Sequence, residues 1–239
     1  MSGGLARHAV VKAAGEGTRL RPVTERWPKP VLPIDGRPVI ATLLRELAAA
    51  GCELAVVVTG YLAEQVEELV GDGAAFGLDV RYARQPGVLG SADTVRRALA
   101  AGAQPPLLVS AADTVYGSGD VRRFAEAFER SGAAGAIAVR RDPRPDGSQR
   151  QPVRIEAGRV LRVIDDDPAN PLSAAPLWAL GPGLVPLLDS LEGPPFELAE
   201  LYREAIASGF EVAGVEIGAT RDLTRPEDLI RENFAYLSS

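Results

Sequence analysis

Cysteine and histidine are almost absent from this sequence of 239 residues. The one cysteine, Cys52, excludes an internal disulfide framework and a zinc site built from cysteines. The one histidine, His8, argues against catalytic triads that use histidine and against metal centres ligated by several histidines. The chemistry of this chain must therefore rest on other residue types.

Long apolar runs and a basic surplus are absent as well. No run approaches the roughly 18 apolar residues that a bilayer span requires, and the N-terminal segment lacks the apolar core of a secretory signal. We therefore expect a cytoplasmic protein with no membrane partner. The formal net charge of −6 argues against a nucleic-acid partner, because proteins that bind the phosphate backbone usually carry a basic face.

Lysine is scarce in a chain that is otherwise rich in basic residues. Only two lysines, Lys12 and Lys29, stand among the 26 basic residues, so the other 24 are arginines. A coding bias toward arginine is one explanation for this ratio. However, lysine and arginine differ as phosphate ligands and are not freely exchanged. Because both lysines fall in the segment that looks suited to phosphate, we favour a functional reason for them.

Short apolar segments alternate with helical segments of about ten residues in the first part of the chain. This alternation predicts an α/β fold with a doubly wound, mostly parallel sheet. Strands are expected at residues 8–11, 53–58, 80–84, 107–109 and 136–139. Helices are expected at residues 40–50, 62–70, 91–100 and 121–130.

The pattern changes after a polar, Pro/Gly-rich loop at residues 140–152. Further strands are expected at residues 153–156, 160–164, 174–180 and 210–217, and a helix at 196–207. A last helix opens with the capping box Thr224–x–x–Glu227 and runs to about residue 236. The second part thus predicts a smaller, β-rich lobe that is inserted into the sheet or built onto it.

A glycine-rich turn follows the first expected strand. Glycines at positions 15 and 17 allow backbone N–H groups to converge on an anion, and Arg19 can add a charge-assisted fork. The usual phosphate motifs do not fit, because no GK[ST] ending is present and Leu20 stands in place of the third glycine of a dinucleotide fingerprint. Lys29 follows between two prolines that restrict its backbone.

Together, GEGTRLRPVT at residues 15–24 and PKP at 28–30 resemble the opening signature of the nucleotide-sugar pyrophosphorylases, the sugar-1-phosphate nucleotidyltransferases. The chain is similar to glucose-1-phosphate uridylyl- and thymidylyltransferases of that family. The resemblance implies a GT-A-like, Rossmann-like fold, with Arg19 and Lys29 as catalytic residues that stabilise charge on phosphates. It also implies a loop that wraps the triphosphate of an NTP, formed by Ala13, Ala14, Gly15, Gly17 and Thr18.

One position in this segment departs from the family pattern. Lys12 stands where the family usually has an apolar residue. Its side chain either adds a phosphate contact or simply reaches from the strand end toward water, and the sequence slightly favours the second explanation.

A second matching stretch, residues 81–95, implies that the nucleotide base is read by Gln85 and Gly90, with Ser91 beside them. The amide of Gln85 can donate and accept, which suits uracil or thymine. A glycine at position 90 lets the backbone lie against the base, and Ser91 is a natural helix cap. The alternative is that Gln85 is a solvated loop residue; its strand–loop–helix context favours base reading.

Two aspartates complete the predicted site. Asp113 follows an apolar strand, and Asp222 precedes the last expected helix; the resemblance makes both of them Mg²⁺ ligands. Two carboxylates are chemically sufficient, because Mg²⁺ keeps waters and takes substrate phosphates as further ligands. On spacing alone, each aspartate is equally compatible with a turn or capping role.

One family feature is missing from the second half. The β-rich lobe of the family often carries Glu-Lys-Pro, whose lysine holds the sugar phosphate, whereas residues 163–168 of this chain read VIDDDP. Three adjacent acids do not attract a phosphate dianion, and such a run is usually a solvated loop. The identity of the acceptor is therefore left open.

The resemblance implies a single domain over residues 1–239, with a nucleotide-binding half at about 1–139 and an acceptor-binding lobe at about 140–239. The expected reaction is transfer of a nucleotidyl group from an NTP, with UTP or dTTP favoured, to a sugar 1-phosphate. The alternatives are a non-catalytic, nucleotide-sensing homologue and a transferase that uses GTP or CTP or a non-sugar phosphate. A homodimer is compatible with the sequence.

Overall fold

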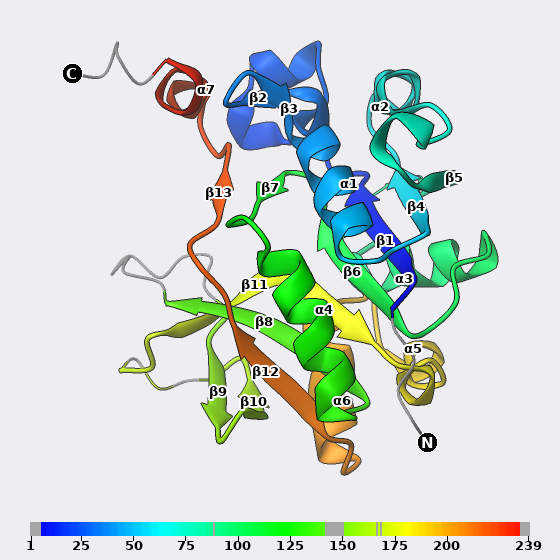
Figure 1. The fold of residues 1–239 in the computed structure, drawn as a ribbon, viewed down its shortest axis with the longest axis vertical. Helices are drawn as coiled ribbons and strands as arrows, with labels where there is room; N and C mark the ends of the chain where they lie inside the picture. Colours follow the sequence, from blue (N-terminus) through cyan, green and yellow to red (C-terminus); the bar gives the residue numbers. More distant parts are fainter. Residues whose placement is uncertain (1–5, 88, 142–150, 166, 168, 235–239) are drawn as a thin grey trace.

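The computed structural model describes residues 6–87, 89–141, 151–165, 167 and 169–234, and a single nine-stranded sheet runs through it (Figure 1). In sheet order, its strands are β5 (Asp79–Arg84), β4 (Leu54–Thr59), β1 (His8–Ala13), β6 (Leu107–Ala111), β11 (Leu172–Leu180), β8 (Gly135–Arg141), β12 (Val212–Glu216), β10 (Arg159–Val163) and β9 (Val153–Glu156).

The sheet is parallel across its first four strands, from β5 to β6, and again between β8 and β12. Between these regions β11 is antiparallel to both of its neighbours, and β10 is antiparallel to β12 and β9 at the far edge. All six residues of β4 are buried, as expected for a parallel strand with both faces covered. Strands β9, β10, β11 and β12, which all follow residue 140 in sequence, belong to this same sheet.

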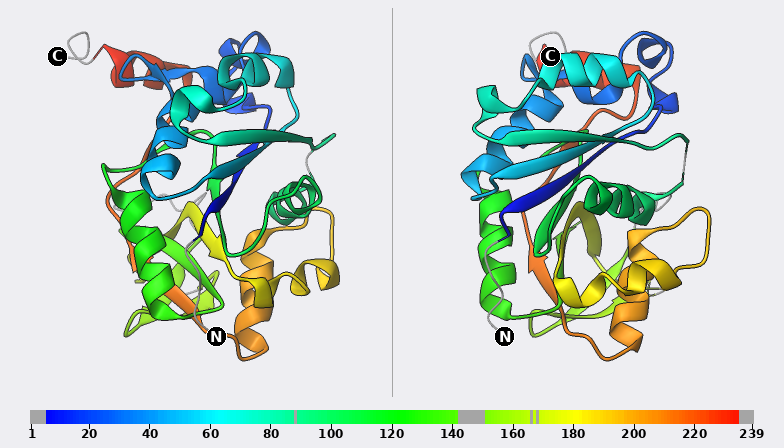
Figure 2. Two further views of the ribbon diagram at one scale, coloured as in Figure 1. Left: turned by 45° about the vertical axis from the view of Figure 1, so that its right-hand side comes forward. Right: turned by 90° about the vertical axis from the view of Figure 1, so that its right-hand side faces the viewer.

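Helices cover both faces of the sheet, as the two side views show (Figure 2). One hydrophobic core lies under α1 (Val39–Ala49), α2 (Ala63–Val70) and α4 (Asp120–Ser131). The other core lies under α3 (Ser91–Ala100), α5 (Leu187–Ser190) and α6 (Leu198–Ala207). The short 3-10 helices are η1 (Thr18–Leu20), η2 (Val23–Glu25), η3 (Lys29–Val31), η4 (Ala74–Phe76) and η5 (Pro182–Leu184).

Central strand β1 alternates between the two cores, as the period of a strand requires. Val11 and Ala13 belong to the core under α1, and Val10 belongs to the core under α3 and α6. Lys12 is two residues beyond Val10 and is therefore on the same face, near the carboxyl end of the strand. The Lys12 side chain thus starts from the middle of the sheet rather than from its edge.

A small third cluster joins the two ends of the chain. Leu223 is fully buried and packs with Leu20 of η1. Nearby, α7 (Pro226–Asn233) contacts the hairpin of β2 (Pro33–Ile34) and β3 (Arg37–Pro38), with Asn233 donating a hydrogen bond to the Pro33 carbonyl at 2.8 Å (Figure 1). The segment before α7 is thereby held beside the glycine-rich turn.

The predicted α/β fold with a mostly parallel, doubly wound sheet is confirmed. Two boundary predictions are wrong. The helix expected from residue 196 begins at Leu198, because Phe196 instead exchanges backbone hydrogen bonds with Leu89 and Ala92. The capping box is displaced by one residue, since Asp228 accepts the backbone N–H groups of Thr224 and Arg225.

The predicted helix end near residue 236 lies outside the described residues. Among the helices of the described chain, none is long and apolar enough to cross a membrane.

Candidate functional site

A cavity of about 410 Å³ opens where β1 and β6 end. Its walls come from the glycine-rich turn, the start of η3, the segment before α3, the turn after β6 and the segment before α7. Every predicted site residue except Asp222 lines this first cavity. These residues are Ala13, Ala14, Gly15, Gly17, Thr18, Arg19, Lys29, Gln85, Gly90, Ser91 and Asp113.

The conformation of the glycine-rich turn depends on Gly17 and on its contacts with two later residues of the same segment. Gly17 has a φ of 62°, which favours glycine, and its carbonyl accepts a 2.9 Å hydrogen bond from the Thr24 hydroxyl. A Cβ on Gly17 would lie 3.0 Å from Cγ2 of Thr24 and 3.4 Å from Cβ of Lys29. The turn is thus packed directly on the buried Thr24 and on the stem of Lys29.

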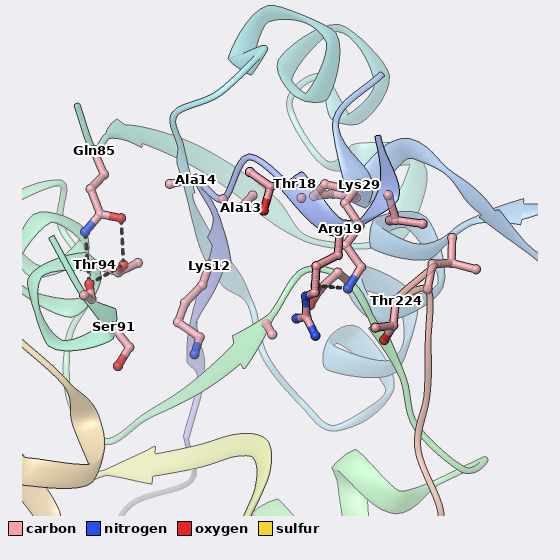
Figure 3. A pocket seen from close by; sticks show the side chains of 18 of the residues that line it. Lys12, Ala13, Ala14, Thr18, Arg19, Lys29, Gln85, Ser91, Thr94 and Thr224 are labelled. Atoms are coloured by element: carbon pink, nitrogen blue, oxygen red, sulfur yellow. Dashed lines mark hydrogen bonds and ion pairs between the residues drawn. The ribbon is translucent and has the colours of Figure 1, made fainter. Parts of the chain in front are cut away.

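The two predicted catalytic cations face the same cavity but differ in their partners. Lys29 Nζ lies 2.6 Å from Oδ2 of Asp113, with 12% and 33% of the two side chains exposed. Arg19 is exposed, and within the described chain its guanidinium has no hydrogen bond or ion pair. Figure 3 shows both side chains extending to the same side of the turn. Arg19 is therefore available to an anionic ligand without breaking an existing contact.

The two predicted metal ligands lie at the turn before β7 (Thr114–Val115) and in the strand that pairs with β7. Asp222 lies in β13 (Arg221–Asp222), which pairs with β7 so that Asp222 stands opposite Thr114. Asp113 immediately precedes Thr114 in sequence. Asp113 lines the first cavity, whereas Asp222 lines a second cavity of about 240 Å³.

Gln85 occupies the predicted wall of the cavity, but its amide contacts its own loop. The side chain is 6% exposed; its Nε2 donates to the Gly90 carbonyl at 3.0 Å and to Oδ2 of Asp93 at 2.8 Å. Its Oε1 accepts a 3.3 Å hydrogen bond from the Thr94 hydroxyl (Figure 3). In this structure both donor hydrogens of the amide hold the start of α3 in place, so Gln85 is not the solvated loop residue of the alternative.

Gly90 and Ser91 both contact the segment before α6, and the helix cap expected at Ser91 is wrong. A Cβ on Gly90 would lie 2.2 Å from the Phe196 carbonyl oxygen, so the absent side chain makes room for the Phe196 backbone. Gly90, not Ser91, is the N-cap of α3. The Ser91 hydroxyl donates to Glu197 at 2.5 Å and accepts the Leu198 N–H at 2.8 Å.

Three further residues of the site were missed from sequence. Glu197 lines both cavities through its contact with the start of α3. Gly60 lies between the two walls, because a Cβ there would be 2.9 Å from the backbone oxygens of both Ala14 and Gln85. The buried Thr24 stands inside the quoted signature and could have been found there, whereas Gly60 and Glu197 lack a local signal.

Lys12 is the one residue with an ammonium group that lines both cavities among the described residues. Burial lowers the pKa of Lys12 below its ordinary value, and the negative charges of Asp113 and Glu197 oppose that shift. The Lys12 side chain is partly exposed and lines both cavities, with its ammonium toward them (Figure 3).

Two members of the acidic run, Asp165 and Asp167, lie among the described residues, and Asp165 is not solvated. Asp165 is 4% exposed and accepts hydrogen bonds from Arg154 at 3.1 Å and from Asn170 at 2.8 Å. Arg154 also binds Asp167 at 2.9 Å. These carboxylates close the loop after β10 through Arg154, and this pairing accounts for their presence without a ligand.

Comparison with known proteins places this site in a family. The model of the family described as "Nucleotidyl transferase" matches residues 8–150, more than half of the chain. Mannose-1-phosphate guanylyltransferase of Mycobacterium tuberculosis is 29% identical over 228 residues, which cover 93% of this chain and 62% of that protein. N-acetylmuramate alpha-1-phosphate uridylyltransferase of Neisseria meningitidis is 39% identical over 104 residues, covering 43% and 45%.

The chain spans between 45% and 64% of the length of the first curated relatives. Solved structures show the same fold at low identity. The inositol-1-phosphate CTP transferase from T. maritima has a TM-score of 0.80 at 19% identity, covering 95% of this chain and 92% of its own. A UDP-glucose pyrophosphorylase complexed with UDP-glucose has a TM-score of 0.81 at 19% identity, covering 98% and 99%.

The family match includes the glycine-rich turn, Lys29, Gln85 and Asp113, which the structure gathers around one cavity. The resemblance found in the opening signature is thereby confirmed, and this chain belongs to the nucleotidyl transferase family, whose members named among its relatives include sugar-1-phosphate nucleotidyltransferases.

Proposed function

We propose that the protein transfers a nucleotidyl group from an NTP to a sugar 1-phosphate and releases pyrophosphate. The observation that carries this proposal is the first cavity, where an open glycine turn, the unpaired Arg19 and the Lys29–Asp113 pair face one another. The second cavity adjoins it and offers space for an acceptor. The relatives named for mannose 1-phosphate and glucose 1-phosphate support this class of acceptor.

The proposed reaction asks for positioning and charge neutralisation rather than for acid–base groups. A phosphate oxygen of the acceptor attacks the α-phosphorus of the NTP, the bond to the bridging oxygen breaks, and pyrophosphate leaves with its electron pair. The turn holds the triphosphate by its backbone N–H groups, and Arg19 and Lys29 neutralise charge on the phosphate oxygens. A chain with one histidine can perform such chemistry.

The residues present fit the Mg²⁺ ion that we propose as cofactor. Asp113 offers a partly exposed carboxylate to the first cavity. Asp222 lies in β13, opposite Thr114, the residue that follows Asp113. Two carboxylates of this kind suit Mg²⁺, which binds few protein oxygens and takes the rest of its ligands from water and phosphates. When bound, Mg²⁺ would neutralise phosphate charge. In this structure Lys29 holds Asp113 at the edge of the cavity.

The preference for UTP or dTTP is a finer part of the proposal. Its support is the place of Gln85 in the cavity wall, although reading a base would require the amide to exchange partners. The relatives include guanylyl-, uridylyl- and thymidylyltransferases and so do not narrow the base. Competition among UTP, dTTP, CTP, GTP and ATP tests this point, and a clear preference for GTP or ATP would refute it.

Release of pyrophosphate from an NTP in the presence of a panel of sugar 1-phosphates tests the function itself. We expect turnover that requires both Mg²⁺ and an acceptor. Asp113→Asn should abolish it while leaving the folded structure intact, because the substitution keeps the shape and removes the charge. Absence of pyrophosphate release with every NTP and acceptor, or near-normal turnover by Asp113→Asn, contradicts the assignment.

The alternative is a non-catalytic, nucleotide-sensing role, and release of pyrophosphate with any NTP and acceptor would exclude it. Asp165 and Asp167 of the acidic run share one partner, Arg154. A cytoplasmic location and a homodimer also belong to the proposal; cell fractionation and light scattering test them.

A further inference from the structure

Lys12 is a partly exposed charged group in the middle of the sheet that lacks a direct partner. No hydrogen bond or ion pair of its ammonium is found within the described chain, although β1 places it among apolar positions of the sheet. Its backbone is fully used, because the Lys12 carbonyl accepts the Ala112 N–H at 3.0 Å beside the strand ladder. The residue is thus fixed at its base and unsatisfied at its tip.

Two acids, Asp113 and Glu197, have negative charges that oppose the lowering of the Lys12 pKa by burial, but each of them is paired with another group. Asp113 is 2.6 Å from Lys29, and Glu197 accepts the hydroxyl of Ser91 at 2.5 Å and the Ser91 N–H at 3.3 Å. A cation that is partly removed from water without a close counter-ion costs free energy in the folded protein. That cost is offset if the ammonium meets an anion that comes from outside the chain.

The position of Lys12 indicates which anion it would meet. The ammonium stands where the first and second cavities share a wall. Arg19 and Lys29 line only the first cavity, and Arg140, the other cation of the second cavity, donates to the Thr220 hydroxyl. A phosphate at this junction would lie beside a nucleotide held in the first cavity and leave its organic substituent in the second.

We propose that Lys12 binds the phosphate monoester of the acceptor at the junction of the two cavities. This inference rests on the proposed nucleotidyl transfer. The substituent on that phosphate is a hydroxylated body, since the second cavity presents Thr114, Gln151 and Thr220, which can donate to and accept from hydroxyl groups. Lys12 therefore orients the attacking phosphate oxygen of the acceptor rather than the triphosphate of the NTP.

The test compares Lys12→Met, which keeps the length and removes the charge, with Lys12→Arg, which keeps the charge. Arg122→Met is the control, because it removes one positive charge from the exposed face of α4, on the opposite side of the sheet. Three quantities are measured: kcat/KM for glucose 1-phosphate or the best acceptor found, Kd of the NTP without acceptor, and thermal stability.

We expect Lys12→Met to lower kcat/KM for the acceptor by about 10- to 100-fold, the range of a hydrogen bond to a charged group. The Kd of the NTP should stay within about twofold, Lys12→Arg should recover part of the loss, and Arg122→Met should match the unaltered protein. An acceptor kcat/KM in Lys12→Met that equals that of the unaltered protein overturns the inference. An equal loss in NTP affinity overturns it too, because Lys12 would then serve the triphosphate.

Binding of glucose 1-phosphate without NTP, followed by calorimetry, separates this inference from the proposed function. If the unaltered protein releases no pyrophosphate but binds glucose 1-phosphate in a manner that Lys12→Met abolishes, the inference stands and the transfer reaction falls. If pyrophosphate is released and the Lys12→Met protein binds the sugar phosphate as well as the unaltered one, the reaction stands and the inference falls.

Discussion

Gly15→Ala separates a role of the glycine turn in ligand binding from a role in folding. No atom lies within 4 Å of a Cβ built on Gly15, and its φ is outside the left-handed region. Alanine therefore fits the free protein without strain. Because alanine restricts the unfolded chain, the substitution should stabilise the fold by about 0.4–1 kcal/mol, which raises Tm by about 1–4 °C in a chain of this size.

The same methyl group should impair the binding of an NTP. If the triphosphate lies against this backbone, the methyl displaces it from one N–H group, and a hydrogen bond to a charged group contributes about 1.5–3 kcal/mol. The expected loss of NTP affinity is therefore about 10- to 150-fold. Two measurements check the prediction, namely thermal unfolding and Kd of the NTP with Mg²⁺.

The matched control is Gly183→Ala in η5, where a Cβ would be 3.5 Å from Phe210 at an ordinary contact distance, outside both cavities. It should behave like Gly15→Ala in unfolding and like the unaltered protein in binding. An NTP affinity of Gly15→Ala within twofold of the unaltered value would refute the reasoning, because the open space at Gly15 would then have no ligand to explain it.

Four further outcomes follow from the structure. Gly90→Ala should destabilise the fold by about 3 kcal/mol or more, measured by denaturant unfolding, since its Cβ would meet the Phe196 backbone at 2.2 Å at a φ of 95°; near-normal stability would contradict the packing. Tyr202→Phe should cost about 1–2 kcal/mol, because the buried hydroxyl donates to the Ala179 carbonyl; an unchanged midpoint would exclude that bond. Lys12→Met should stabilise the protein by about 1–3 kcal/mol at neutral pH. Since the pKa of Lys12 is lowered on folding, this difference should shrink as pH rises from the folded pKa toward 10.5, and a difference constant with pH would contradict the burial of the ammonium.

Local chemistry accounts for the parts of the site that the sequence predicts correctly. The glycine turn, Arg19 and Lys29 lie within one short segment whose prolines and glycines restrict the backbone in recognisable ways. Their convergence on one cavity follows from the parallel strands, because the carboxyl ends of β1 and β6 lie at the same edge. No distant contact had to be known for this part of the prediction.

The contacts that the sequence could not indicate arise mainly where a residue meets a partner far away in sequence. Gly90 is shaped by Phe196, and Ser91 binds Glu197, so both depend on how α6 docks beside α3. The strand–loop–helix context of Gln85 favours base reading, but it does not indicate the partners of the amide within its own loop. The turn of α3 that brings Asp93 and Thr94 to the amide became visible only in three dimensions.

The charges in the two cavities indicate that their cations serve to bind ligands rather than to stabilise the fold. Of Lys12, Arg19 and Lys29, only Lys29 has a counter-ion within the described chain, and that partner, Asp113, is itself turned toward the cavity. An unpaired cation that is partly removed from water weakens the fold, so packing alone gives no reason to keep Lys12 in β1 where apolar residues would fill the same face. Two separate anions, a triphosphate at Arg19 and a phosphate monoester at Lys12, would neutralise both free cations. We therefore expect that saturation with both substrates raises the stability of the protein by more than saturation with either substrate alone.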